Sequence, residues 1–107
     1  MPDEQEQRYL DLIQQFPDSP LGYFSLAKYY VDARRFDDAV PHLERCLAHD
    51  PSWAAALVAL ADAHAGAGRP EKAIAILEQA QKTALAQNHR TMADEIADRL
   101  DELQRGF

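Results

Sequence analysis

Residues 17–44, PDSPLGYFSLAKYYVDARRFDDAVPHLE, are repeated in part by residues 51–78, PSWAAALVALADAHAGAGRPEKAIAILE, at an offset of 34 residues. Eight positions are identical in the two copies: Pro17, Leu26, Ala27, Ala33, Arg35, Ala39, Leu43 and Glu44 recur as Pro51, Leu60, Ala61, Ala67, Arg69, Ala73, Leu77 and Glu78. A fixed period of this length predicts a stacked array, in which each unit buries its apolar face on its neighbours. Proteins built as such arrays usually offer a surface to other molecules and do not catalyse a reaction.

The charge of the chain is concentrated at its two ends. The chain has 107 residues, which is enough for a single domain over 1–107. Its formal net charge is −7. Residues 1–20 contain five acidic side chains and one basic, and residues 88–107 contain five acidic and three basic, so the terminal segments carry −4 and −2. The middle therefore carries only −1. Because no basic stripe is present to neutralise phosphates, the sequence predicts no nucleic-acid partner.

The sequence also indicates where the protein resides. Cys46 is the only cysteine and cannot form an internal disulfide, which fits a reducing compartment. No apolar run approaches the roughly 20 residues that span a bilayer, and the acidic N-terminus lacks the apolar core of a signal peptide. We therefore expect a cytoplasmic protein with no membrane partner.

Apolar residues at helical spacing predict an all-α protein with about six helices. The expected ranges are 3–16, 20–33, 37–49, 53–66, 70–87 and 90–105. Pro41 lies in the first turns of the third helix, so this helix either begins late, near Asp38, or bends at the proline. The last helix has one apolar stripe and a charged exterior, which is typical of a helix that caps an array.

The spacing of small and large residues resembles that of the tetratricopeptide repeat, a 34-residue helix-turn-helix unit. The matching positions are Leu26, Ala27, Tyr30, Ala39, Leu43, Cys46 and Pro51 in the first copy and Leu57, Leu60, Ala61, His64, Ala73, Leu77 and Ala80 in the second. The resemblance implies a short right-handed α-solenoid with a repeat-half helix (3–17), two repeats (20–53 and 54–87) and a C-terminal capping helix (90–105). The chain departs from the family pattern at Arg34, where glycine is usual, at His64 for tyrosine, and at Leu85 for proline.

The resemblance further implies a concave groove lined by the first helix of each repeat, in which a partner's peptide or amphipathic helix binds. Carried onto this chain, the groove-facing residues are Leu21, Phe24, Lys28, Val31, Asp32, Ala55, Val58 and Asp62. In this interpretation the partner's apolar anchors lie along Phe24 and Val58, and Lys28 and Asp62 set the register. The alternative is that the apolar members simply pack against the protein's own helices.

Some members of the family grip a C-terminal carboxylate with lysines, asparagines and an arginine along this groove. Here Phe24 occupies the place of the first clamp lysine, and Lys28 and Ala59 occupy places where asparagine is needed. The resemblance therefore does not extend to that clamp.

A second hypothesis is structural self-assembly. The first helix lacks the helix that would normally precede it in such an array, so part of its apolar face, formed by Tyr9, Ile13 and Phe16, is expected to be uncovered. An uncovered stacking edge favours a homodimer in which the same surface of both copies meets.

Other chemistry is weakly indicated. His42, Cys46 and His49 share one face of a helix and are possible zinc ligands, but a fourth ligand is missing and Cys46 occupies a small-residue packing position. No phosphate-binding loop or nucleophile elbow is present. The sequence predicts no enzyme, no metal site and no cofactor.

Overall fold

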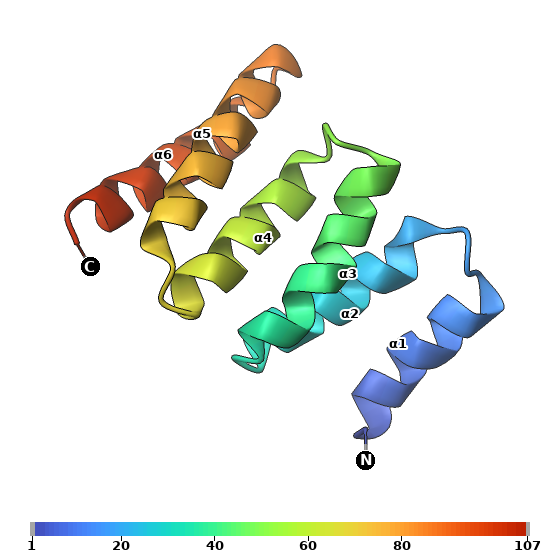
Figure 1. Cartoon of the computed structure of the whole chain (residues 1–107). Helices are drawn as coiled ribbons and strands as arrows, with labels where there is room; N and C mark the ends of the chain where they lie inside the picture. The colour runs from blue at the N-terminus through green and yellow to red at the C-terminus, as the bar shows by residue number, and fades with distance from the viewer. Residues whose placement is uncertain (1, 107) are drawn as a thin grey trace.

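The computed structural model describes residues 2–106, and this part of the chain forms six α-helices (Figure 1). They are α1 (Glu4–Gln15), α2 (Pro20–Asp32), α3 (Phe36–His49), α4 (Ala54–Gly66), α5 (Pro70–Ala86) and α6 (Arg90–Gln104). The all-α prediction is confirmed. α3 begins at Phe36, ahead of Pro41, and continues through the proline, so the late start near Asp38 is wrong.

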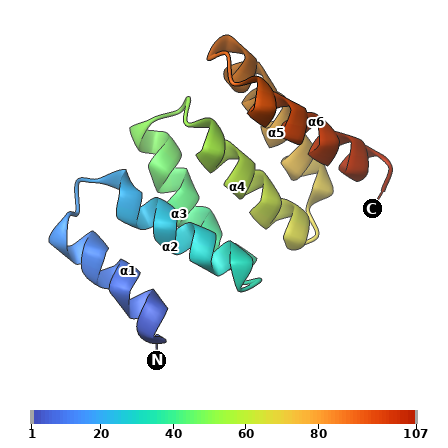
Figure 2. The same ribbon diagram turned by 180° about the vertical axis from the view of Figure 1, so that it is seen from behind.

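Each helix packs mainly on the helices next to it in sequence, and α2 also contacts α4 directly. The result is an elongated body of 39 × 28 × 20 Å. Seen from behind, α2, α4 and α6 lie in front of α3 and α5 (Figure 2). We call the surface formed by these three helices the α2–α4–α6 face. α1 packs on α2 at the N-terminal end of the array.

The helix ends follow from local sequence. The side chains of Asp3 and Ser19 accept hydrogen bonds from the first turns of α1 and α2, which satisfies backbone N–H groups that have no partner inside the helix. After α2 and α4 the chain reverses through residues with positive φ, Arg34 (62°) and Gly68 (84°). Glycine occupies this left-handed conformation without steric cost, which is the physical reason that glycine is usual at the position of Arg34.

Small residues allow the helices of each pair to approach closely. Ala27, Ala39 and Cys46 are completely buried, and their equivalents 34 residues later are buried to within 1%. These equivalents are Ala61, Ala73 and Ala80. The largest fully buried side chains, Leu26, Leu43, Leu77 and Ile96, fill the space between the helices.

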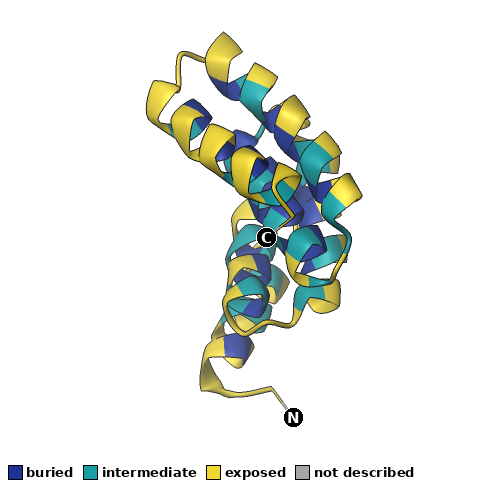
Figure 3. Cartoon of the chain, turned by 90° about the vertical axis from the view of Figure 1, so that its left-hand side faces the viewer, coloured by how far each residue is buried: buried dark blue, intermediate teal, exposed yellow. Residues whose placement is uncertain are grey.

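Two clusters of buried residues make up the core, and Leu47 and Ile76 pack against both. Figure 3 shows the buried residues lying between the helices, whereas α1, near the N-terminus, is largely exposed or half-buried. Within residues 2–106, no helix combines the length and the apolar character that crossing a membrane requires.

Candidate functional site

The structure divides the predicted groove residues into exposed and half-buried groups. Leu21, with 62% of its surface exposed, Lys28 and Asp32 are exposed on α2. The remaining five, Phe24, Val31, Ala55, Val58 and Asp62, are half-buried. Phe24 and Val31 pack on the N-terminal core cluster and Val58 on the C-terminal one, so these three serve the protein's own packing as well as its surface.

An aromatic pair joins α2 to the start of α4. The rings of Phe24 and Trp53 stack with centroids 4.7 Å apart and an angle of 27° between their planes. Trp53 is the single tryptophan of the chain and stands at the N-cap of α4, without a capping side-chain hydrogen bond. Trp53 is not among the predicted groove residues, and the sequence predicts it as the first residue of the helix 53–66, where the structure has the N-cap. Its 34-residue equivalent, Ser19, is an N-cap, and that register was the available signal.

A hollow of about 250 Å³ opens beside this pair, between the α3–α4 loop and the start of α6. It is lined by Asp50, Ser52, Trp53, Ala54, Ala55, Gln87, His89 and Met92. The Gln87 side-chain amide donates a 2.9 Å hydrogen bond to the Ser52 carbonyl, which ties the α5–α6 connection to the α3–α4 loop. The hollow is smaller than a typical ligand pocket and has room for about one apolar side chain. Of these lining residues, only Ala55 is among the predicted groove residues.

Asp62 is bound within the chain. Arg99 of α6 donates to both carboxylate oxygens of Asp62, at 2.9 and 3.3 Å, and each side chain is about one-third exposed. This ion pair joins α6 to α4 on the α2–α4–α6 face. Asp62 is therefore already neutralised, whereas Lys28 has no ion-pair partner within residues 2–106.

The predicted dimer edge is partly covered by α2. The Tyr9 ring lies 6.0 Å from that of Tyr29, and Ile13 packs so closely on Gly22 that an added Cβ would lie 2.9 Å from Ile13 Cγ1. Phe16, in contrast, is 54% exposed.

Polar contacts complete the docking of α1. Buried Glu6 accepts hydrogen bonds from the Tyr30 hydroxyl at 2.6 Å and from Arg35 at 3.1 Å. Asp3 accepts from the Tyr29 hydroxyl. Burial and the hydrogen bond to Glu6 raise the pKa of Tyr30 to about 12, so its hydroxyl remains a proton donor at neutral pH.

The second copy of the repeat has a related contact. Arg69 Nε donates to Nδ1 of the buried His64 at 2.9 Å and its guanidinium also binds Asp37 at 2.8 Å. Burial, followed by the nearby positive charges of Arg69 and Lys72, lowers the pKa of His64. A neutral imidazole is required here, because a protonated Nδ1 cannot accept the hydrogen bond.

The possible zinc ligands face different surroundings. His42 lies beside the rings of Tyr23 and Tyr30, while the buried Cys46 directs its Sγ to the Pro20 carbonyl at 3.7 Å. Burial raises the pKa of the Cys46 thiol to about 11, which favours the protonated form over the thiolate that binds metal. Within the described part of the chain, no three His, Cys, Asp or Glu side chains are arranged to hold a metal ion.

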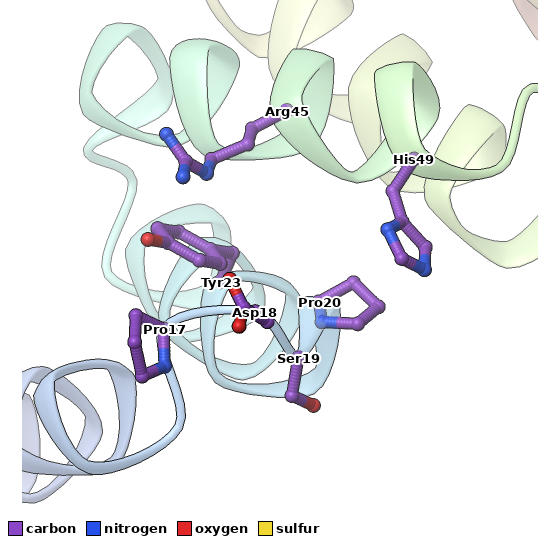
Figure 4. A pocket seen from close by; sticks show the side chains of 7 residues that line it. All are labelled: Pro17, Asp18, Ser19, Pro20, Tyr23, Arg45 and His49. Carbon is purple, nitrogen blue, oxygen red and sulfur yellow. The ribbon is translucent and has the colours of Figure 1, made fainter.

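His49 lines a separate hollow where the α1–α2 loop meets α3 (Figure 4). Pro17, Asp18, Ser19, Pro20, Tyr23 and Arg45 complete its lining. The Arg45 guanidinium lies over the Tyr23 ring, 4.5 Å from the centroid, so a cation–π contact already engages the main positive charge of this hollow.

The fold and its exposed face define the class of protein: a short array of stacked helical pairs with one extended surface. The family model of the tetratricopeptide repeat matches residues 30–93, and this chain belongs to that family. Tetratricopeptide repeats generally act as scaffolds for protein interaction and are not catalytic.

Relatives support this assignment over nearly the whole chain. The TPR repeat-containing protein PA0015 of Pseudomonas aeruginosa is 33% identical over 88 residues, which cover 82% of this chain and 84% of that protein. The solution structure of protein BPP2914 from Bordetella parapertussis superposes with a TM-score of 0.86 at 28% identity, covering 98% of this chain and 90% of the other. The TPR2B domain of yeast Sti1, in a complex with pHsp70, superposes with a TM-score of 0.87 at 20% identity, covering 95% of this chain and 82% of the other. At that identity the last likeness concerns the fold.

Proposed function

We propose that this protein binds a peptide or helix of another protein along the α2–α4–α6 face and is not an enzyme. The observation that carries the proposal is Leu21, which is 62% exposed at the start of α2, one turn before the Phe24–Trp53 stack. When a partner covers a large exposed apolar side chain beside an aromatic pair, apolar surface is removed from water and binding is favoured. The free thiol of Cys46 agrees with a cytosolic location, which we include in the proposal.

The pHsp70 complex of the Sti1 domain supports the use of such a fold for peptide binding. It does not supply the identity of the partner here. Phe24 and Lys28 stand where the carboxylate clamp of some family members would need lysine and asparagine, so the recognition chemistry on this chain is different.

Two exposed leucines provide a matched test. Leu21→Glu places a charge on the proposed face, while Leu85→Glu places the same charge on α5, where Leu85 is 56% exposed. We expect Leu21→Glu to abolish capture of protein partners from a lysate of the native host, and Leu85→Glu to leave it unchanged. Thermal unfolding of both variants should match that of the unmodified protein, since neither side chain is buried. If the Leu21→Glu variant still captures partners, the α2–α4–α6 face is not the binding surface.

Phe24→Glu is a less selective probe than Leu21→Glu. If Phe24 only lined the groove, this variant would abolish partner capture and leave the melting temperature nearly unchanged. Because Phe24 stacks on Trp53 and packs on the core, the structure leads us to expect a lower melting temperature as well.

A homodimer through α1 remains the second candidate. Phe16, 54% exposed at the end of α1, is the observation that favours it. Light scattering over a range of concentrations tests the idea: a dimer that Phe16→Ser converts to a monomer supports it, and a monomer at every concentration contradicts it.

A further inference from the structure

The α2–α4–α6 face has an uneven distribution of charge. On α2 the exposed charges are Lys28 and Asp32, which balance each other. On α6, Glu95, Asp98 and Glu102 are exposed and follow each other at spacings of three and four residues, so they lie along one side of the helix. From Glu95 to Glu102 the row extends about 10 Å, at a rise of about 1.5 Å for each of the seven steps along the helix.

The position of this row relative to α4 follows from the contacts of α6. Ala93, Ile96 and Leu100 are buried toward α5, and Arg99 reaches Asp62 on α4. Glu95 and Glu102 lie four residues before and three residues after Arg99, so they border the same side of the helix. Glu95 and Glu102 therefore border the side of α6 that contacts α4, and Asp98 lies next to them on the side away from the buried residues.

Within residues 2–106, the three carboxylates of the row form no ion pair, since Glu95, Asp98 and Glu102 have no Lys, Arg or His within ion-pair distance. Arg99 is engaged by Asp62, and Arg105 by Asp101 at 3.1 Å. Three carboxylates thus remain available to a partner.

An apolar site adjoins the row. Met92 lines the hollow beside Trp53 and, together with Glu95, a second hollow at the start of α6. Met92 therefore borders both the hollow that would hold an apolar anchor and the hollow that contains Glu95, the first carboxylate of the row. A ligand that fits both the apolar hollow and the acidic row is chemically more restricted than one that fits only one of them.

We propose that the partner segment is a basic amphipathic helix, whose apolar side chain enters the hollow between Trp53 and Met92 and whose lysines or arginines pair with Glu95, Asp98 and Glu102. Basic side chains on successive turns of a helix have the spacing of the acidic row. This inference rests on the proposed function and adds the chemistry of the partner.

The single tryptophan provides a direct readout, since Trp53 lines the proposed anchor hollow. The probes are two synthetic peptides of about 14 residues, roughly four helical turns, with the same leucines on one face. One peptide has lysine at the positions that border the leucines, and its twin has glutamate at the same positions. Each is titrated into the full chain while Trp53 fluorescence is recorded.

We expect the lysine peptide to bind about tenfold more tightly than its twin, because exposed ion pairs are individually weak and three act together. Added salt should reduce the difference, since it screens exposed charges. The triple variant Glu95→Gln, Asp98→Asn, Glu102→Gln should lose this advantage. The control variant Glu44→Gln, Glu71→Gln, Glu78→Gln removes the same charge from α3 and α5 and should retain it.

Three outcomes would overturn the inference: no binding of the lysine peptide, equal affinity of the two peptides, or equal losses in both triple variants. The proposed function fails separately. If both peptides bind equally and Leu21→Glu weakens both, the face is a binding surface and only the basic character of the partner is wrong. If Leu21→Glu changes the affinity of neither peptide, the face itself is not the binding surface.

Discussion

The two copies of the repeat, residues 20–53 and 54–87, share a backbone plan but use different side chains. α2 buries four residues, whereas α4 buries eight, six of them alanine or leucine within Ala54–Ala61. α4 is in contact with α2, α3 and α5, and through Arg99 with α6, so most of its circumference is covered. α2 lies nearer the end of the array and carries the aromatic and exposed groups. The central helix α4 has small apolar residues because its neighbours cover it. The less enclosed helix α2 carries the exposed side chains.

The same comparison applies to the contacts between copies. Arg35 and Arg69 are equivalent, and each reaches back past the helix before it to an acidic residue one helix earlier, Glu6 on α1 and Asp37 on α3. The aromatic residue beside the arginine differs: Arg35 lies over the Tyr30 ring at 4.5 Å, and Arg69 donates to His64. One junction therefore contains a histidine whose pKa is lowered by burial, and the other contains a tyrosine at the same position.

The largest expected effects come from equivalent core leucines. Leu43 and Leu77 are 0% and 1% exposed, and truncation leaves a cavity in each copy. We expect Leu43→Ala and Leu77→Ala each to lower the free energy of unfolding by about 2–5 kcal/mol. Urea unfolding followed by circular dichroism measures both. The exposed Leu85→Ala is the control, with a change of about 0.5 kcal/mol or less. A loss below about 1 kcal/mol for one leucine alone would show that the two copies are not equivalent in packing.

A smaller effect should separate the two junctions at acidic pH. Because the pKa of His64 is lowered in the folded state, the unfolded chain binds its proton first, near pH 6.5, and folding stability falls as the pH decreases below that value. His42, whose pKa is also lowered by burial, contributes in the same direction. We expect His64→Tyr, which restores the residue type of Tyr30, to lose less stability between neutral and mildly acidic pH than the unmodified protein. Melting temperatures across this range test the expectation, and identical slopes would contradict it.

The smallest effect concerns the turns that end α2 and α4. Arg34 adopts a φ of 62°, which is costly for a residue with a Cβ, whereas Gly68 has a φ of 84° without strain. Arg34→Gly should raise the free energy of unfolding by somewhat less than about 1 kcal/mol, since it also removes the contact of the guanidinium with the Phe36 ring at 5.6 Å. Gly68→Ala should lower it by about 1 kcal/mol. Changes of the same sign in the two variants would disprove this account.

Much of the fold could be predicted from local patterns. The 34-residue period, the small residues at Ala27 and Ala61 and the prolines at the starts of α2 and α5 identified six helices and their pairing, because these features act over one or two helical turns or through a fixed repeat. Pro41 suggested a late start for α3, near Asp38, which is wrong. A proline disfavours a helix interior locally, but buried Ala39, Leu43 and Cys46 hold the segment in the core.

The candidate site was less predictable because it depends on which side chains from distant segments meet. Sequence alone determined the family and the helical array. Only the tertiary structure decided that Trp53 stacks on Phe24, that Met92 joins it around a hollow, and that Arg99 neutralises Asp62. These contacts join residues from different helices, and their geometry is set by how the helices cross. Helical periodicity within one segment carries no information about that crossing.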